Sequence, residues 1–590
     1  MLPAFRSGAE ALTKPYEILS KGLNLSVASA GTGNPLRFPP VFTNGSTMTL
    51  AQSNFEVWPG QQTSIIGINN SYPGPTVKIN KGQTLTVNFQ NNLTEDATIH
   101  WHGLITPELM DGHPKDAVPP GMSKTYTFPV LNRAGTYFYH SHAHMITAKH
   151  VFKGFAGFFI VDDPLEPTYG LPTGNYDIPL CIQDHRIADI PNFTYNPLTE
   201  DIHYGFLGDT VLVNGTPDAY FEVSKTMYRF RILNGSNARV YKIALSDNSP
   251  FHIIGTDGGL KDTPGQVTSF MLSPGERVEI LIDFSSYSIG QNVILKTLPY
   301  SWQGMSTYKQ GVELNILRFD IVNNNSSGGV VPVSMTPIEY YNPNEVTFVR
   351  NFSLTIFGSG TNVHRINGLY FDMNRIDWET PLNALEEWKI FNQTSDFHPM
   401  HAHGVLWQVL ARNNNYNLAP NDKGWKDTVL VNGVETVRVL VKFTDYKGIY
   451  LFHCHNLEHE DDGMMLNFKV KDPIGIKQIS SEVPKEFKLH QNYPNPFNPV
   501  TKIRFSLPSP SARMRNGQEG GVQAVKIIIY NVLGIEVASL IPPHWGGKEG
   551  LTPGTYEVKF DGSNHTSGIY FAKMTSGGGY SKTIKMILAK

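Results

Sequence analysis

The sequence predicts an all-β protein made of several β-sandwich domains. Of its 590 residues, 53 are Gly, 40 are Pro and 11% are aromatic. This composition favours many short strands separated by turns, and no long stretch shows the period of an amphipathic helix. A threefold internal repeat also favours several domains. A chain of this length should form about three to five of them.

Three landmarks recur roughly every 150 residues between positions 42 and 472. The first is a strand that ends in Asn, the second is a turn that leads into a strand, and the third is a Gly that opens another strand. They lie at 84–91, 119–121 and Gly135, at 228–234, 273–275 and Gly290, and at 387–392, 431–433 and Gly448. Each repeat has the size of one β-sandwich domain.

The repeat divides the chain into six predicted segments. They are an N-terminal arm (1–41), three β-sandwich domains (42–165, 166–330 and 331–472), a polar linker (473–486) and a small C-terminal β-sandwich (487–590). In the arm, residues 23–30 are too few and too polar for the apolar core of a secretory signal. We therefore expect a loose arm or the remnant of a trimmed export signal.

Charge and cysteine content exclude several classes of protein. With a formal net charge of −3 and 17% charged residues, the chain gives no reason to expect a nucleic-acid partner. No run reaches about 18 apolar residues, so we expect no membrane span. The two cysteines are Cys181 and Cys454. If Cys454 binds a metal, no disulfide is available, and Cys181 is then an inert core residue.

Repeats one and three each carry two His-x-His pairs at matching offsets from their landmarks. One pair begins nine residues after the Asn, and the other begins five residues after the Gly. The pairs are His100 and His102, His140 and His142, His401 and His403, and His453 and His455. Repeat two has Ile243, Leu245, Leu295 and Thr297 at these places, so we expect its domain to be a spacer without metal.

Each His-x-His pair lies in a predicted strand, so both imidazoles leave the same face. Neutral imidazole is a common copper ligand, and eight imidazoles at one domain interface suit a cluster of three metals. A single pair could be an ordinary core or surface feature. Four pairs at repeat-matched positions favour the metal cluster.

A second metal site is predicted around Cys454. In a strand over 449–455, His453 and His455 share one face and Cys454 takes the other. Cys454, His459 and Met464 lie at offsets of 0, 5 and 10, and His398 can turn away from the pair that follows it. A thiolate, two imidazoles and a weak axial thioether make a blue-copper electron-transfer site. Repeat one has Ser141 where repeat three has Cys454, so only repeat three should carry this site.

These motifs resemble the multicopper oxidases, and among them the three-domain bacterial laccases. The resemblance covers about 45–472 and rests on His100-Trp101-His102-Gly103, Tyr139-His140-Ser141-His142, the run from His398 to Gly404 and the run from His453 to Met464. It implies three cupredoxin-like Greek-key domains and four copper ions. Type 1 copper would take His398, Cys454, His459 and Met464; type 2 would take His100 and His401; and the type 3 pair would take His102, His140, His142, His403, His453 and His455.

Two acids also resemble functional positions of that family. Asp111 resembles the acid beside the type 2 copper, and Glu460 resembles the acid near the type 3 pair. Reduction of dioxygen consumes protons, so both are candidate donors. The alternatives are a turn-forming role for Asp111, in Asp111-Gly112, and a solvated Glu460. Asp461 and Asp462 are expected to be solvated. Three further histidines are expected at surface or supporting positions: His113, His144 and His150.

The C-terminal module carries no metal-ligand pattern. It resembles the sorting domains of the type IX secretion system, through the run from Tyr493 to Pro499 and the strand Gly568-Ile569-Tyr570-Phe571. The resemblance implies that secretion machinery exports the protein to the cell surface or the medium. An ordinary accessory β domain for adhesion or sugar binding is the alternative.

The expected function is that of a laccase-like benzenediol:oxygen oxidoreductase. Such an enzyme oxidises small phenolic or aromatic substrates one electron at a time and reduces dioxygen to water. We expect a monomer. A cuprous or other metal-ion oxidase for copper tolerance is less favoured, because the 16 Met are scattered and 304–345 holds no Met cluster. A bilirubin-oxidase-like enzyme stays open. A metal-free cupredoxin scaffold that acts as a binding protein would require lost ligands, and all twelve are present.

Overall fold

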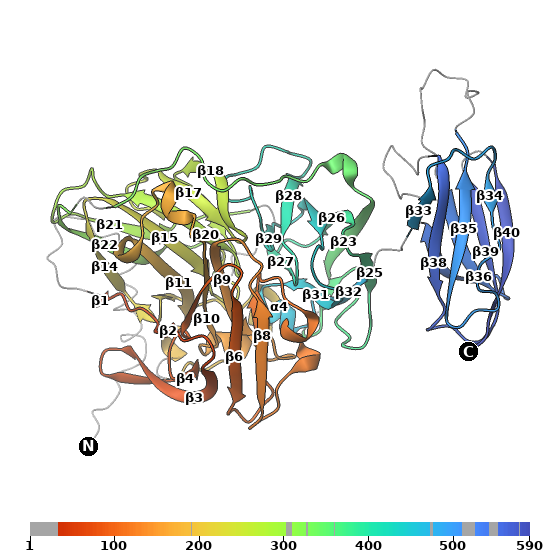
Figure 1. Cartoon of the computed structure of the whole chain (residues 1–590). Coiled ribbons are helices and arrows are strands. Elements are labelled where there is room, and N and C mark those ends of the chain that lie inside the picture. Colours follow the sequence, from red (N-terminus) through yellow and green to blue (C-terminus); the bar gives the residue numbers. More distant parts are fainter. Residues whose placement is uncertain are drawn as a thin grey trace.

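The computed structural model describes residues 33–189, 192–302, 309–325, 328–358, 360–471, 476–509, 525–541, 553–576 and 579–590. Strands dominate these residues, and they form eight sheets that pack as four sandwiches. Figure 1 shows three sandwiches side by side and the fourth, blue, set apart from them. The predicted all-β fold class is confirmed. The end of the predicted N-terminal arm is not loose, because β1 (Asn34–Pro35) pairs with a strand of the second sandwich. The rest of the arm, residues 1–32, lies outside the described residues.

The first sandwich packs a four-stranded sheet on a five-stranded sheet. Leu85, Val87 and Phe89 alternate inward from β6 into the shared core, as one buried face requires. The strands are β2 (Val41–Phe42), β3 (Thr47–Trp58), β4 (Gln61–Ile68), β5 (Thr76–Asn80), β6 (Thr84–Asn91), β7 (Ile99–His102), β8 (Ser123–Pro129), β9 (Gly135–Ser141) and β10 (Ala156–Asp162). In the five-stranded sheet the order is β2-β5-β10-β9-β7, which brings β7 beside β9.

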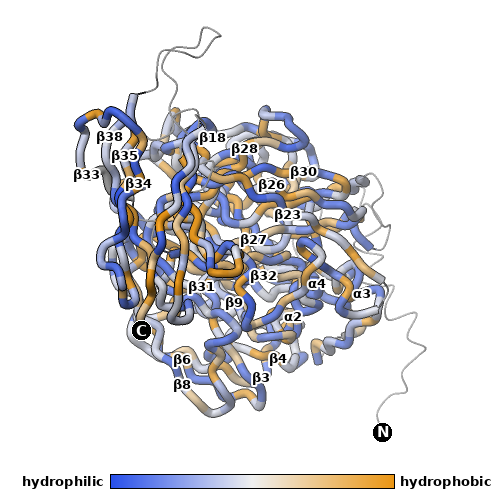
Figure 2. Tube along the Cα trace, turned by 90° about the vertical axis from the view of Figure 1, so that its right-hand side faces the viewer, coloured by the Kyte–Doolittle hydropathy of each residue, from blue (hydrophilic) through white to orange (hydrophobic). Residues whose placement is uncertain are grey.

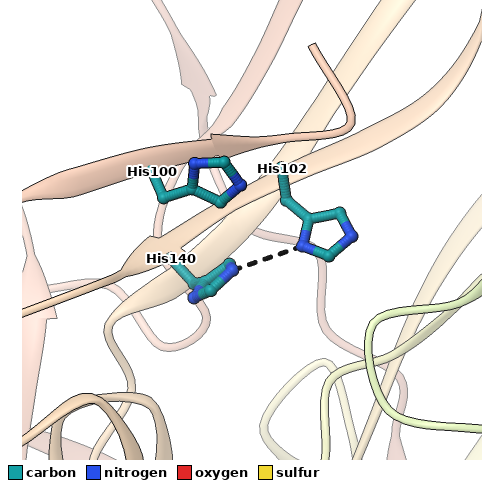
Figure 3. Close-up of side chains that lie close together, drawn as sticks. All are labelled: His100, His102 and His140. Atoms are coloured by element: carbon teal, nitrogen blue, oxygen red, sulfur yellow. Dashed lines mark hydrogen bonds between the residues drawn. The ribbon is translucent and has the colours of Figure 1, made fainter. Parts of the chain in front are cut away.

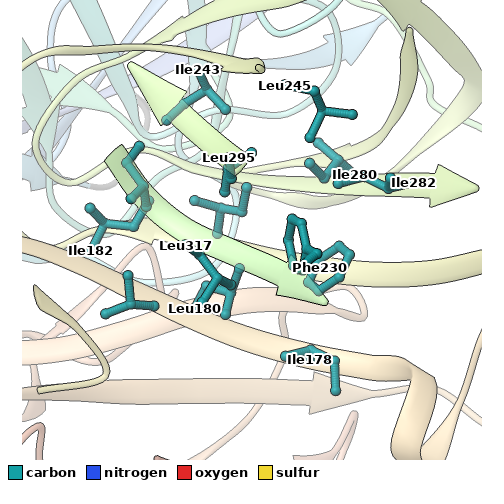
Figure 4. Close-up of a cluster of buried hydrophobic side chains, with 14 of the residues drawn as sticks. Ile178, Leu180, Ile182, Phe230, Ile243, Leu245, Ile280, Ile282, Leu295 and Leu317 are labelled. Atoms are coloured by element: carbon teal, nitrogen blue, oxygen red, sulfur yellow. The ribbon is translucent and has the colours of Figure 1, made fainter. Parts of the chain in front are cut away.

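The second sandwich is the largest of the four in the described residues, with a seven-stranded and a six-stranded sheet. Figure 4 shows its core, where Phe230 and Leu317 pack between the sheets with aliphatic neighbours. The strands are β11 (Asp177–His185), β12 (Thr210–Val213), β13 (Thr216–Pro217), β14 (Ala219–Ser224), β15 (Met227–Asn234), β16 (Tyr241–Leu245), β17 (Phe251–Thr256), β18 (Gly259–Val267), β19 (Ser269–Leu272), β20 (Arg277–Asp283), β21 (Asn292–Thr297) and β22 (Leu314–Asn323), with β1 at one edge.

The third sandwich packs two five-stranded sheets, in the orders β24-β23-β26-β30-β28 and β25-β32-β31-β27-β29. The second of these sheets brings β27 beside β31. Its strands are β23 (Phe348–Ile356), β24 (His364–Ile366), β25 (Trp378–Pro381), β26 (Leu385–Asn392), β27 (His398–Ala402), β28 (Trp407–Arg412), β29 (Thr428–Val431), β30 (Thr436–Lys442), β31 (Gly448–Cys454) and β32 (Met465–Lys471).

The predicted repeat is visible in the strand pairing. β6, β15 and β26 each lie between a parallel neighbour (β3, β11 or β23) and an antiparallel one (β8, β20 or β30). Each ends in the Asn landmark, whose side-chain amide donates hydrogen bonds to two or three main-chain carbonyls beyond the strand. The acceptors are Glu95 and Val118 for Asn91, Arg239 and Leu272 for Asn234, and Asp396, Val431 and Asn432 for Asn392. The recurring Asn therefore fixes the loop that follows the central strand of each sandwich.

The C-terminal sandwich has the sheet orders β33-β38-β35-β34 and β37-β36-β39-β40. Strand β33 falls within the predicted linker and pairs with β38, so that stretch is in part an edge strand of the module. The strands are β33 (Ile476–Ser480), β34 (Lys488–Leu489), β35 (Val500–Leu507), β36 (Val525–Asn531), β37 (Glu536–Ile541), β38 (Gly554–Asp561), β39 (Gly568–Ser576) and β40 (Ser581–Leu588).

Helices are short and lie in connections. Figure 2 shows α2 (Thr147–Phe152), α3 (Thr199–Tyr204) and α4 (Leu457–Asp461) at the same end of the molecule. The 3-10 turns are Glu108–Met110, Pro114–Asp116, Glu166–Tyr169, Gly174–Tyr176, Ile187–Asp189 and Pro343–Glu345. In the described part of the chain, no helix has the length and apolar character needed to cross a bilayer.

Candidate metal centres

Side-chain alternation places five of the eight paired histidines on the outer surface of two neighbouring sheets, and His142, His403 and His455 lie one residue beyond the ends of β9, β27 and β31. In β7, Trp101 points into the first core, so His100 and His102 point out of it. In β31, Phe452 and Cys454 point into the third core, so His453 points out. Pairing then aligns the motifs, because His100 lies opposite His140 and His401 lies opposite His453. Figure 3 shows His100, His102 and His140 from these neighbouring strands, with a dashed line joining the rings of His102 and His140.

The ring nitrogens of the eight histidines converge in three groups. His100 Nε2 and His401 Nε2 are 3.4 Å apart. His140 Nε2 lies 3.4 Å from His102 Nδ1 and 3.4 Å from His455 Nε2. His453 Nε2 lies 3.3 Å from His142 Nε2 and 3.1 Å from His403 Nε2. The first group holds the two residues predicted for type 2 copper, and the other two hold the six predicted for the type 3 pair; this assignment stays a prediction.

Burial keeps seven of these imidazoles neutral. It lowers the pKa of His140 to about 3 and lowers the pKa of six more far below the usual range, with further lowering by the neighbouring rings. The six are His100, His102, His142, His401, His403 and His455. A neutral imidazole offers one lone pair, so nitrogens that face each other fit a shared cation better than one another. The donor set therefore fits copper, which imidazole suits.

Six of the eight outer ring nitrogens donate hydrogen bonds to the protein, which fixes the orientations of those rings. Main-chain carbonyls accept from His100 (Asp111 O, 2.7 Å), His401 (Asp427 O, 2.8 Å), His140 (Ser141 O, 2.8 Å) and His453 (Cys454 O, 3.1 Å). Carboxylates accept from His403 (Asp111 Oδ2, 2.6 Å) and His102 (Asp427 Oδ1, 3.0 Å). Each of these bonds leaves the inner nitrogen free to bind a metal.

The donors of the predicted mononuclear site also meet. Cys454 Sγ lies 3.6 Å from His398 Nδ1 and 3.7 Å from His459 Nδ1, and the two imidazole nitrogens are 3.2 Å apart. Burial raises the pKa of the Cys454 thiol well above its usual range, so a thiolate there needs a bound cation. Met464 packs in the same core as Cys454. Met465 packs with Leu451 on the opposite side of the sheet.

The two candidate acids lie beside the trinuclear histidines. Asp111 accepts from His403 and from the Thr106 hydroxyl (3.2 Å), and burial raises its pKa to about 8. The Asp-Gly turn is present as well, since Gly112 has a φ of 89° and a Cβ there would meet Ile99. Glu460 is buried, with Oε2 3.2 Å from His453 Nδ1. The solvated alternative for Glu460 is therefore wrong.

Comparison with known proteins agrees with this geometry. Family models described as "Multicopper oxidase" match residues 49–166, 191–319 and 338–473. Bilirubin oxidase from Albifimbria verrucaria is 30% identical over 466 residues, which cover 74% of this chain and 80% of that protein. The chain belongs to the multicopper oxidase family.

Other relatives of this multicopper oxidase match over most of their own length. Laccase from Bacillus subtilis is 30% identical over 476 residues, which cover 70% of this chain and 91% of that protein. The crystal structure of McoA multicopper oxidase from Aquifex aeolicus matches with a TM-score of 0.69 and 37% identity, over 75% of this chain and all of that one. A family model described as "Secretion system C-terminal sorting domain" matches residues 491–589, so the oxidase carries a sorting domain for export to the cell surface or medium.

Two acids of this multicopper oxidase that were expected to be solvated are not. Asp461 accepts hydrogen bonds from the main-chain N–H groups of Thr147 and Ala148, where α2 begins. Asp462 is buried and accepts from His364 Nδ1 at 2.7 Å. The reason is tertiary, because α4 packs between α2 and the loop before β24, and these contacts cannot be read from a local acidic run.

The extra histidines divide into two kinds. His144 is exposed, which agrees with the surface position expected for it. His113 and His150 are buried and support the structure, since His113 Nε2 bonds Asn467 (2.8 Å) and His150 bonds Ser141 and Glu95. Burial lowers the pKa of His113 to about 4.

Sequence reasoning missed four residues near the centres. Asp427 contacts His102 and His401, and Arg277 from the second sandwich binds Asp427. His364 stacks on His459 with ring centroids 3.9 Å apart, and the His203 carbonyl accepts from His459 Nε2 at 3.0 Å. None of these lies in a repeated motif, so only the tertiary structure reveals them.

Proposed function

We propose that this multicopper oxidase is a laccase-like enzyme that oxidises small phenolic or aromatic substrates and reduces dioxygen to water. The observation that carries the proposal is the completeness of both donor sets, each buried and each made of side chains that suit copper. Bound copper would supply the one-electron redox chemistry. The assigned ligands are His398, Cys454, His459 and Met464 for type 1, His100 and His401 for type 2, and His102, His140, His142, His403, His453 and His455 for type 3.

The protein's own residues would link the two centres. Cys454 is the last residue of β31, with His453 before it in the strand and His455 directly after it, and the Cys454 side chain points into the core, away from the trinuclear histidines. A single stretch of main chain therefore joins the mononuclear donors to the trinuclear donors. The surrounding carbonyls and carboxylates hold six of the eight trinuclear imidazoles in the tautomer that a metal requires.

Asp111 and Glu460 would serve the reduction of dioxygen as proton donors. Both are buried within hydrogen-bond or ion-pair distance of trinuclear histidines, and neither belongs to a donor set. A water-excluded cluster needs such groups close at hand. Asp111, which also holds His403, is the stronger candidate because its contact is the shorter.

Substrate class is decided by experiment. The enzyme should be loaded with copper, checked for blue colour and four coppers per chain, and assayed for oxygen uptake with phenols, a non-phenolic dye, bilirubin and Cu(I). We expect phenols and the dye to give the highest kcat/KM. Preference for bilirubin would favour the specificity named for the Albifimbria relative, and preference for Cu(I) would favour a metal-ion oxidase. A chain that binds no copper would be a scaffold instead of an enzyme.

A further inference from the structure

A cluster of five buried charges joins the second and third sandwiches beside the trinuclear histidines. Asp257, Glu276 and Arg277 come from the second sandwich, and Lys426 and Asp427 come from the third. Lys426 Nζ lies 3.0 Å from both Asp257 Oδ2 and Glu276 Oε1. Three acids and two bases leave one formal negative charge in the cluster. That charge must be satisfied by further hydrogen-bond donors, because a buried unpaired carboxylate is costly.

The centre of this cluster is a two-pronged contact between Arg277 and Asp427. Arg277 Nη1 donates to Asp427 Oδ1 at 2.8 Å, and Nη2 donates to Oδ2 at 2.5 Å. The remaining guanidinium hydrogens go to main-chain carbonyls of Thr136 (3.1 Å), Gly275 (2.8 Å) and Asp257 (2.9 Å). Such a fork fixes the plane of the carboxylate as well as its position.

Asp427 passes this constraint to histidines of two different repeats. Its Oδ1 accepts from His102 Nε2 at 3.0 Å, and its main-chain carbonyl accepts from His401 Nδ1 at 2.8 Å. The approach is close, because a Cβ on Gly103 would meet Asp427 Oδ2 at 2.2 Å, and Gly103 has a φ of +80°. The second sandwich also reaches the cluster directly, since a Cβ on Gly275 would lie 3.0 Å from the His455 ring.

We propose that the copper-free second repeat builds the trinuclear centre, with Arg277 as the positioning residue that fixes Asp427 and thereby orients His102 and His401. This inference rests on the ligand assignment of the proposed function. The sequence suggested that repeat two is only a spacer. Its Arg277 instead holds repeats one and three at the distance that lets their histidines share metals.

The test compares Arg277→Lys with a matched control, Arg231→Lys. Arg231 is also buried in the second sandwich, makes a two-pronged contact with Asp177 (2.8 Å twice) and reaches Thr136. It contacts none of the eight histidines in any described interaction. Both substitutions keep the charge and remove the fork.

Each full-length variant is loaded with copper and measured in three ways: copper per chain, the type 2 electron paramagnetic resonance signal and the blue absorption of the type 1 centre. Arg277→Lys should weaken copper retention at the trinuclear centre by about 10- to 100-fold, the usual effect of losing a residue that orients ligands. The blue band should persist, because Arg277 touches no type 1 donor. Arg231→Lys should keep all copper, although thermal unfolding moves to lower temperature.

The outcomes separate the two hypotheses. If the unmodified protein is blue and holds its full copper while Arg277→Lys loses type 2 copper selectively, the positioning role stands. Full copper and an unchanged type 2 signal in Arg277→Lys overturn it, as does equal loss in Arg231→Lys. If Arg277→Lys does not fold, Asp427→Asn is measured instead, since it keeps the shape and one acceptor but weakens the pairing; an unchanged type 2 spectrum there also overturns the inference. Absence of copper from the unmodified protein would instead refute the proposed function.

Discussion

The two candidate metal centres differ in how many parts of the molecule build them. The mononuclear centre draws all its donors from the third sandwich, and three of them lie within eleven consecutive residues from Cys454 to Met464. The trinuclear centre draws histidines from two sandwiches and is held by Arg277 from another. A centre built from two neighbouring strands of one sheet and the helix that follows one of them depends on the geometry of a single domain. A centre shared between domains depends on how those domains close.

Removing the thiolate should affect the mononuclear centre far more than the trinuclear centre. Cys454→Ser should abolish the intense blue absorption and all oxidase turnover, because no other thiol reaches the site and the hard serine oxygen is a poor substitute. The protein should stay folded, with trinuclear copper present. Absorption spectra and oxygen uptake of the purified variant give the answer, and a variant that stays blue would show that Cys454 is not the thiolate ligand.

The next largest effect concerns the trinuclear side alone. Asp111→Asn should lower turnover at least about tenfold, a threshold set below the ~10²–10⁴-fold that acid–base groups contribute. Copper content and blue colour should persist. During anaerobic mixing, substrate should bleach the blue band at the normal rate, and recovery of the band on adding dioxygen should become slow.

Two results would speak against a proton-donor role for Asp111. One is normal turnover of the variant. The other is loss of type 2 copper, which would mean that Asp111 acts by holding His403 and the turn at Gly112.

The same contrast explains what could be predicted from the sequence. The period-2 pattern and the Asn and Gly landmarks suffice for the fold and for the convergence of all eight histidines, because register fixes which face each side chain takes. The roles of Asp462, Arg277 and Asp427 could not be predicted. Their partners lie far away in sequence, such as His364 for Asp462 and His102 for Asp427, and no repeat or offset connects them.

A smaller effect is expected at the axial position of the mononuclear centre. Met464 shares the core of Cys454, whereas Met465 faces Leu451, so only Met464 is placed to act as the weak axial ligand. Met464→Leu should raise the reduction potential of the type 1 copper, and Met465→Leu should leave it unchanged. Redox titration of both variants checks this, and the reverse pattern would move the axial role to Met465.

The smallest effect should come from removing the C-terminal module. In the described residues, strands β33 to β40 pair only with one another, and their core is separate from those of the other three sandwiches. None of the predicted ligands lies beyond residue 472, and β33 shows that the cut must fall before Ile476 if the module's edge strand is not to be left behind. A chain that ends at Asp472 should therefore keep its copper per chain and its specific activity, while export of the protein from cells should fail. Metal analysis and oxygen uptake of the soluble truncated protein, measured beside the full chain, decide the point. Parallel losses of copper and turnover would mean that the module helps to hold the domains closed around the trinuclear centre, and the contrast between a locally built and a jointly built site would then extend to a fourth domain.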